Sequence, residues 1–190
     1  MVDPADAAAV LEALPEALEI EDENARAAVI ATWASLWRQS RWQKLEDAPY
    51  SLAPAVTCGV IEHTRAVVAG VRAYARAVAA IHDVEIDDQR LLVVALLHDA
   101  SKLIEYEPDS DGKKQTSEVG RMFPHATLGG FACLSNGLPI DVAHEVVTHT
   151  IGCSTRPQSL EGVLLYYVDM ACSDLLRFTA EAPLHLAGRK

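Results

Sequence analysis

The residue types best suited to metal chemistry follow directly on an apolar run. His98 and Asp99 come after seven consecutive apolar residues, 91–97, and Lys102 follows three positions later. Burying a polar or charged group is costly unless it is paired or bound to a metal. An imidazole and a carboxylate at the end of a buried helix therefore indicate a metal site.

Four more residues are candidate ligands, each on a different predicted helix: His63, His125, His149 and Asp169. Asp169 follows the apolar segment 163–168, where a lone buried carboxylate would be expensive. Helix bundles build metal sites from side chains that project inward from several helices. Imidazole and carboxylate ligands together suit iron, manganese or zinc.

A second histidine, His144, lies close to His149 in the sequence and could be considered as a metal ligand in its place. His144 and His149 are five positions apart, so on a helix they point about 140° away from one another and cannot share an ion. We therefore expect His149 to be the ligand and His144 to lie at the surface or behind a ligand. Glu145, four positions before His149, could orient that imidazole, although a solvated helix carboxylate is the simpler interpretation.

The signature H…HD…D formed by four of these candidates resembles that of the HD-domain superfamily of metal-dependent phosphohydrolases: His63, His98, Asp99 and Asp169. Residues 96–102 resemble the HD-x-x-K segment of that family, and the similarity extends over about residues 58–178. The remaining two histidines fall where its two-metal branches have additional ones. Segments 149–152 and 164–169 are also similar to bacterial diadenosine tetraphosphate hydrolases of this type.

The sequence departs from the family pattern in two places. Ser101 stands where glycine is common, and the segment 104–121 matches nothing in the family. The resemblance therefore implies a reaction class but no particular substrate.

The resemblance implies a phosphohydrolase that binds two divalent ions per chain, iron or manganese, with zinc, nickel, cobalt and magnesium as alternatives. One ion would be bound by His63, His98, Asp99 and Asp169, and the second by His125 and His149, with Asp99 bridging. The ions would lower the pKa of a bound water, so that hydroxide attacks phosphorus in line.

Basic residues near these ligands are candidate substrate contacts. Lys102 would stabilise charge on the phosphoryl oxygens, and Lys113, Lys114 and Arg121 would bind substrate phosphates. The expected substrate is a small phosphorylated compound, by resemblance a nucleotide or dinucleoside polyphosphate. Two alternatives remain open: a diiron oxygenase that cleaves a C–P or C–C bond with the same ligands, and a metal-binding regulator without turnover.

Alanine and leucine dominate and strand-like alternation is nearly absent, so the sequence predicts an all-α fold. By resemblance this fold is an HD-domain helical bundle, residues 55–190, with an N-terminal helical extension, residues 1–54. Helices are expected at 58–82, 88–104, 124–136, 139–150 and 158–179. Residues 105–121 should form a long functional loop. The tryptophans, all before residue 43, should pack the extension on the main domain. The alternatives are a homodimer contact and a wall of the active-site pocket.

Composition excludes several functions. The net charge of −11 over 190 residues disfavours binding to a nucleic acid polymer. No apolar run is long enough to cross a bilayer and no leader-like segment begins the chain, so we expect a cytoplasmic protein. The four cysteines are widely spaced and should be reduced.

Overall fold

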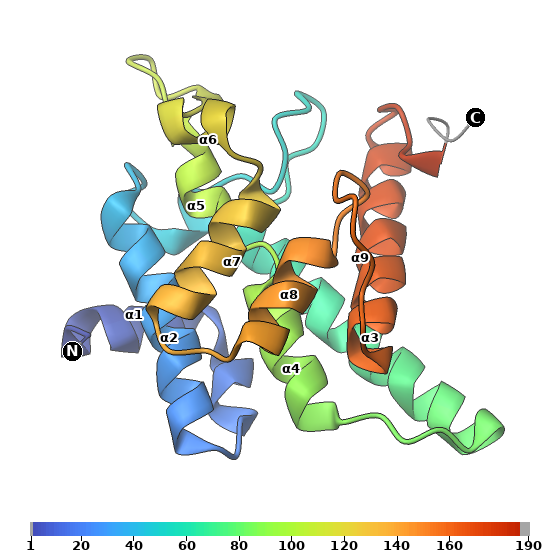
Figure 1. Ribbon diagram of the computed structural model, residues 1–190. Coiled ribbons are helices and arrows are strands. Elements are labelled where there is room, and N and C mark those ends of the chain that lie inside the picture. The colour runs from blue at the N-terminus through green and yellow to red at the C-terminus, as the bar shows by residue number, and fades with distance from the viewer. Residues whose placement is uncertain (1, 187–190) are drawn as a thin grey trace.

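The computed structural model describes residues 2–186 and consists almost entirely of packed helices (Figure 1). The α-helices are α1 Pro4–Ala13, α2 Glu23–Gln39, α3 Val60–His82, α4 Asp88–Leu97, α5 Lys102–Glu105, α6 Glu118–Met122, α7 His125–Ser135, α8 Ile140–Thr148 and α9 Leu160–Thr179. Two 3₁₀ turns, η1 Pro15–Glu19 and η2 Leu45–Asp47, link the N-terminal elements. The predicted all-α bundle is confirmed.

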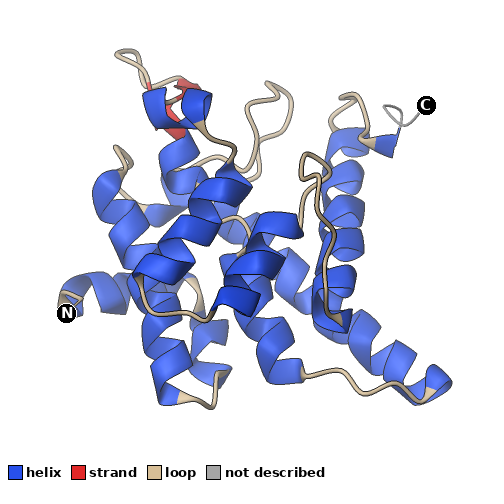
Figure 2. Ribbon diagram, viewed as in Figure 1, coloured by secondary structure: helices blue, strands red, loops and turns tan. Residues whose placement is uncertain are grey.

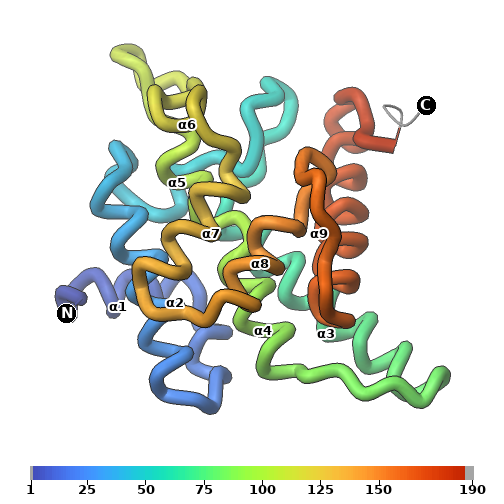
Figure 3. Tube along the Cα trace, viewed as in Figure 1, coloured from blue at the N-terminus to red at the C-terminus, as the bar shows by residue number. Residues whose placement is uncertain are grey.

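Helix α4 lies at the centre of the bundle, where it packs against α2, α3, α8 and α9. Every residue from 91 to 97 is buried, which is expected for a helix that is apolar all round. The chain trace in Figure 3 leads from the N-terminal helices through α3 and α4 to α6 and α7, and returns along α9. The end of α4 is therefore surrounded by helices from both halves of the chain.

The prediction of one helix over 88–104 is wrong. Helix α4 ends at Leu97, residues 98–101 form a turn, and the short α5 begins at Lys102. This break leaves His98 and Asp99 at the inner end of the central helix.

Capping side chains begin both α4, which leads to Asp99, and α9, which carries Asp169. The Asp87 carboxylate accepts a hydrogen bond from the Arg90 amide at the start of α4. The Ser159 hydroxyl accepts one from the Gly162 amide at the start of α9. Each cap satisfies an amide that has no partner within its helix, and so sets where the helix begins.

The N-terminal helices share one hydrophobic core with the rest of the chain. The buried Trp33 indole of α2 donates to the carbonyl of Leu96 in α4, at 2.8 Å. Trp42 donates to the carbonyl of Tyr106 at 3.1 Å. Trp33 and Trp42 thus bind the N-terminal segment to later parts of the chain, whereas the Trp37 indole donates to the Trp42 carbonyl within that segment.

The prediction of an irregular loop over 105–121 is wrong. Strands β1 Tyr106–Pro108 and β2 Lys114–Thr116 form an antiparallel hairpin, with Tyr106 paired to Thr116, and α6 follows (Figure 2). Gly120 in α6 packs so closely on α5 that a Cβ there would lie 2.3 Å from the Glu105 carbonyl oxygen. This close packing fixes Glu105 beside the end of α4.

Among residues 2–186, no helix combines the length and the apolar character needed to cross a membrane.

Candidate metal centre

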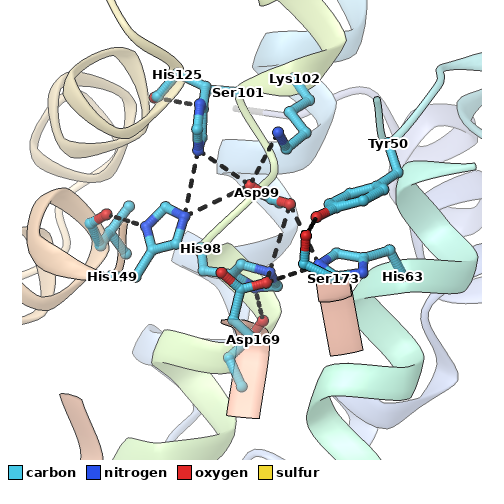
Figure 4. A network of polar contacts seen from close by, with 12 residues as sticks. Tyr50, His63, His98, Asp99, Ser101, Lys102, His125, His149, Asp169 and Ser173 are labelled. Carbon is cyan, nitrogen blue, oxygen red and sulfur yellow. Dashed lines mark hydrogen bonds and ion pairs between the residues drawn. The ribbon is translucent and has the colours of Figure 1, made fainter. Parts of the chain in front are cut away.

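The structure brings all six predicted metal ligands together at the inner end of α4 (Figure 4). They form two groups that share Asp99. The first group is His63, His98, Asp99 and Asp169, and the second is Asp99, His125 and His149. Within each group the candidate ligand atoms all lie within 4.8 Å of one another.

The first group joins α3, α4 and α9. Asp99 Oδ2 lies 3.5 Å from His63 Nε2 and 3.6 Å from His98 Nε2. Asp169 Oδ1 lies 2.9 Å from His63 Nε2 and 3.8 Å from His98 Nε2. All four residues are buried, so this half of the centre is closed to solvent.

The second group joins the end of α4 to α7 and α8. Here the other carboxylate oxygen, Asp99 Oδ1, lies 3.3 Å from His125 Nε2 and 3.6 Å from His149 Nε2. The two imidazole nitrogens are 3.3 Å apart. Asp99 therefore turns one oxygen to each half of the centre, as a bridging ligand would.

Hydrogen bonds on the far side of the rings fix which nitrogens can bind metal. His98 Nδ1 donates to the Ala95 carbonyl at 2.7 Å, and His149 Nδ1 donates to the Val146 carbonyl at 2.6 Å. Because a carbonyl only accepts, the Nε2 atom of each neutral ring has a free lone pair. His125 Nδ1 faces the Glu105 carboxylate at 3.5 Å, which has the same effect on His125.

The donor set fits a divalent cation. His125 and His149 turn two lone pairs toward each other, an arrangement that needs a proton or a cation between them. His98 Nε2 and Asp99 Oδ1 are buried without any hydrogen-bond partner. Unpartnered buried polar atoms are rare in proteins, and here they are aimed into the centre, where an ion would satisfy them.

Burial controls the protonation of these ligands. Burial lowers the pKa of His98 to about 4, although Asp99 and Asp169 favour its charged form. Burial also lowers the pKa of His125, and the Lys102 charge lowers it further.

Burial opposes charge on Asp99, but Lys102 and His98 outweigh it and hold the Asp99 pKa well below its usual range. Burial would lower the pKa of His149, but the Asp99 carboxylate, 3.6 Å from its Nε2, outweighs burial and raises it. At neutral pH the centre thus has a carboxylate and neutral rings at His98 and His125, whereas a proton and a metal ion would compete for His149.

Lys102 lies beside the metal centre, and its side chain stays protonated there. Its Nζ is 3.7 Å from Asp99 Oδ1 and 3.9 Å from Glu105 Oε2. The ammonium also lies over the rings of Tyr50 and Tyr106, at 5.1 and 5.6 Å from their centroids. Burial would lower the Lys102 pKa, but the neighbouring carboxylates, Asp99 foremost, raise it above its usual value.

Three residues that the sequence analysis did not select support the ligands. The Tyr50 ring stacks on His63 at a centroid distance of 3.8 Å, and its hydroxyl bonds to Ser173 at 2.5 Å. Glu105 faces His125, as described above. Tyr50 lies in an irregular segment without periodicity, so no sequence pattern indicated its role. Glu105 follows Lys102 by about one helical turn, and this spacing was a weak indication that the two side chains lie close together.

Ser101, which departs from the family pattern, has a local function. Its hydroxyl donates to the His125 carbonyl at 2.5 Å. This bond ties the turn after Asp99 to the first residue of α7, and so helps to place the His125 ring.

The three basic residues expected to bind substrate do not contact the six ligands. Lys114 Nζ donates to carbonyls of the segment 51–56, with distances of 2.7 Å to Ser51 and 2.9 Å to Val56. Arg121 donates to the Thr116 carbonyl at 2.7 Å, and the exposed Lys113 lies 3.9 Å from Asp111. The assignment of these three residues to substrate binding stays a prediction. The ammonium group of Lys114 already donates hydrogen bonds to the 51–56 segment.

The simpler expectation for Glu145, a solvated carboxylate, is wrong. Glu145 is buried, accepts a hydrogen bond from the Gln158 amide at 3.2 Å, and lies 3.9 Å from Arg90. It does not orient His149, because the Val146 carbonyl does so. His144 lies outside the ligand groups, and its Nε2 is 3.1 Å from the Arg156 carbonyl.

Comparisons with known proteins agree with this geometry. The family model described as HD domain matches residues 60–171. Dihydroneopterin 2',3'-cyclic phosphate phosphodiesterase of Methanocaldococcus jannaschii is 30% identical to the chain over 134 residues. The alignment covers 69% of this chain but 53% of that protein, so the chain spans about half the length of this curated relative. No solved structure matches the chain.

Proposed function

The chain belongs to the HD-domain family, and from that premise we propose that it is a metal-dependent phosphohydrolase acting on a small phosphorylated compound. The observation that carries the proposal is the position of Asp99, whose two oxygens face two separate groups of imidazoles. This arrangement supports a centre for two divalent ions with Asp99 shared between them. Its mixed nitrogen and oxygen ligands favour iron or manganese.

Divalent ions bound by these residues would lower the pKa of a coordinated water and so supply the nucleophile near neutral pH. The protein's own side chains prepare the rest of the site. Lys102 stays an ammonium ion beside Asp99 and can stabilise negative charge on a phosphoryl oxygen. Tyr50 and Glu105 hold the rings of His63 and His125 in place.

The exposure of the ligands indicates where a substrate approaches. The His125 side chain is 17% exposed, whereas the other five ligand side chains are at most 6% exposed. A phosphate group would therefore reach the centre on the side of His125. On that side it meets Lys102, which is 9% exposed.

The substrate class rests on two lines of support. The resemblance to nucleotide hydrolases suggests a nucleotide or dinucleoside polyphosphate. The Methanocaldococcus jannaschii relative is named as a phosphodiesterase for a 2',3'-cyclic phosphate, which supports cleavage of a phosphoester bond. We therefore propose a nucleotide-like phosphoester or phosphoanhydride as substrate.

The test is hydrolysis by protein loaded with Mn²⁺ or Fe²⁺, with dinucleoside polyphosphates, nucleoside monophosphates and 2',3'-cyclic nucleotides as substrates. We expect metal-dependent turnover of at least one class. Asp99→Asn, which keeps the shape of the side chain but removes its charge, should abolish it. His82→Ala, which removes an exposed histidine from the same helix as His63, is the control and should leave turnover unchanged. Oxygen consumption without hydrolysis would instead identify the oxygenase alternative.

A further inference from the structure

A cleft of about 550 Å³ lies beside the metal centre, between the loop 149–159 and α9. It adjoins the centre through two elements. Thr148 and Thr150, which flank the ligand His149, both line it. Tyr166, three residues before the ligand Asp169 and about 4.5 Å from it along the helix axis, lines the opposite wall. Figure 1 shows the loop running alongside α9.

Two residues that are not candidate metal ligands, His144 and Glu145, hold the loop 149–159 in place. His144 Nε2 donates to the Arg156 carbonyl at 3.1 Å, and Glu145 accepts from the Gln158 amide at 3.2 Å. The Gln158 side chain donates to the same Arg156 carbonyl at 3.2 Å. The cleft is therefore formed before any ligand arrives, as most small-molecule sites are.

Two side chains of the cleft, Arg156 and Tyr167, offer exposed binding groups, and the Tyr167 ring is held by an edge-to-face contact with Tyr166 at a centroid distance of 5.3 Å. Of the arginines within residues 2–186, only Arg156 and Arg76 have a guanidinium without an ion pair or hydrogen bond, and only Arg156 lines this cleft. Each of the other described arginines has at least one ion pair or hydrogen bond, as an excess of carboxylates in a protein of net charge −11 favours. Tyr167 leaves an aromatic ring 64% exposed at the same cleft.

We propose that this cleft is the subsite for an aromatic heterocycle carried by the phosphorylated substrate, one that presents an oxo group and an acceptor ring nitrogen on the same edge, as a 6-oxopurine does with O6 and N7. The inference rests on the proposed function, because it needs the phosphate to lie at the metal centre. The planar fork of Arg156 can donate two hydrogen bonds to such an acceptor pair, as arginine does to guanine O6 and N7. Adenine has an amino donor in place of the oxo group and would meet Arg156 donor to donor. The ring face of Tyr167 supplies stacking, which tolerates either purine.

Equilibrium binding tests the subsite without turnover. Calorimetry on Mn²⁺-loaded protein would compare the non-hydrolysable phosphonate analogues of GMP, AMP and ribose 5-phosphate, named below by their parent compounds, which share a phosphonate and differ in the ring. We expect GMP to bind most tightly and ribose 5-phosphate most weakly. Arg156→Ala should weaken GMP binding roughly tenfold and leave ribose 5-phosphate binding unchanged.

Matched variants separate three contributions to ring binding: the two hydrogen bonds from the Arg156 guanidinium, its positive charge, and stacking on Tyr167. Arg156→Lys keeps the charge without the fork, so it should still lose the preference for GMP over AMP. Tyr167→Ala should weaken GMP and AMP alike, whereas Tyr167→Phe, which keeps the ring, should not. Arg76→Ala, which removes the other unpaired guanidinium among residues 2–186 and the same unit of charge, should change none of the three affinities.

Two outcomes overturn the inference. In one, the wild-type protein binds all three compounds equally. In the other, Arg156→Ala weakens ribose 5-phosphate as much as GMP, which would make Arg156 a phosphate contact. Either result leaves the proposed hydrolase standing as long as metal-dependent cleavage of any phosphoester is observed. Conversely, ring discrimination without hydrolysis of any phosphoester would support the subsite and remove the proposed reaction.

Discussion

The buried His98 imidazole should make the metal-free protein sensitive to mild acid. Its ring is fully buried, and its Nδ1 atom is committed to the Ala95 carbonyl. Protonation of the second nitrogen, Nε2, would place a cation in the core of the bundle. Burial accordingly lowers the pKa of His98 from 6.5 to about 4 in the folded state.

The sign and size of the effect follow from this difference in pKa. As the pH falls below 6.5, the unfolded chain binds a proton at His98 and the folded chain does not until about pH 4. The free energy of unfolding therefore decreases with falling pH across this window. A shift of this size corresponds to about 3 kcal/mol in total, of which about 2 kcal/mol is lost by pH 5.

Urea unfolding of metal-free protein at pH 7 and pH 5 measures this loss. His98→Gln keeps a neutral amide that can donate to the Ala95 carbonyl, so it removes only the titrating group. The wild-type protein should lose about 2 kcal/mol more than the variant between the two pH values. Titrating groups that do not interact with His98 are present in both proteins and cancel in the comparison. The Asp99 pKa lies well below its usual range, so Asp99 stays charged from pH 7 to pH 5. Equal losses in the two proteins would refute the view that His98 is held neutral, and His82→Gln, at an exposed histidine, should behave as the wild type does.

Three further predictions concern other side chains. Lys102→Met should lower kcat on the order of a hundredfold with little change in metal content, because it removes a charge that stabilises the transition state; metal analysis with steady-state kinetics checks this, and loss of metal would contradict it. Lys114→Ala should lower the free energy of unfolding by about 1–3 kcal/mol, because carbonyls of the 51–56 segment lose their donor; a variant as stable as the wild type in urea would show that this contact is unimportant. His144→Ala should leave the metal content unchanged, since His144 fastens the loop and does not face the ions; depletion of metal would contradict this placement.

The candidate ligands His98, Asp99 and Asp169 were predictable because each is a polar residue next to an apolar helical segment. His63, His125 and His149 were predicted from the family resemblance. His98 and Asp99 end a run that the structure buries completely, and Asp169 lies in the buried face of α9. The helical phase between His144 and His149 correctly separated a ligand candidate from a loop contact.

The parts that sequence reasoning missed depend on long-range contacts. The helix breaks after Leu97 although no proline or glycine follows there, and residues 98–101 form a turn at the metal centre. The hairpin strands are three residues long, too short for alternation to reveal them. Glu145 is buried because of partners far along the chain, Arg90 and Gln158, and no local pattern indicates them.

The number of ions bound per chain tests the two-ion centre most directly. Protein purified without chelator and reconstituted with Mn²⁺ would be analysed for metal content, in parallel with a His125→Ala/His149→Ala double variant. The wild-type chain should bind two ions and the double variant one, because His63, His98, Asp99 and Asp169 remain as a complete ligand group. One ion in both proteins would contradict the bridging position of Asp99, and no ion in the wild type would contradict the metal centre itself.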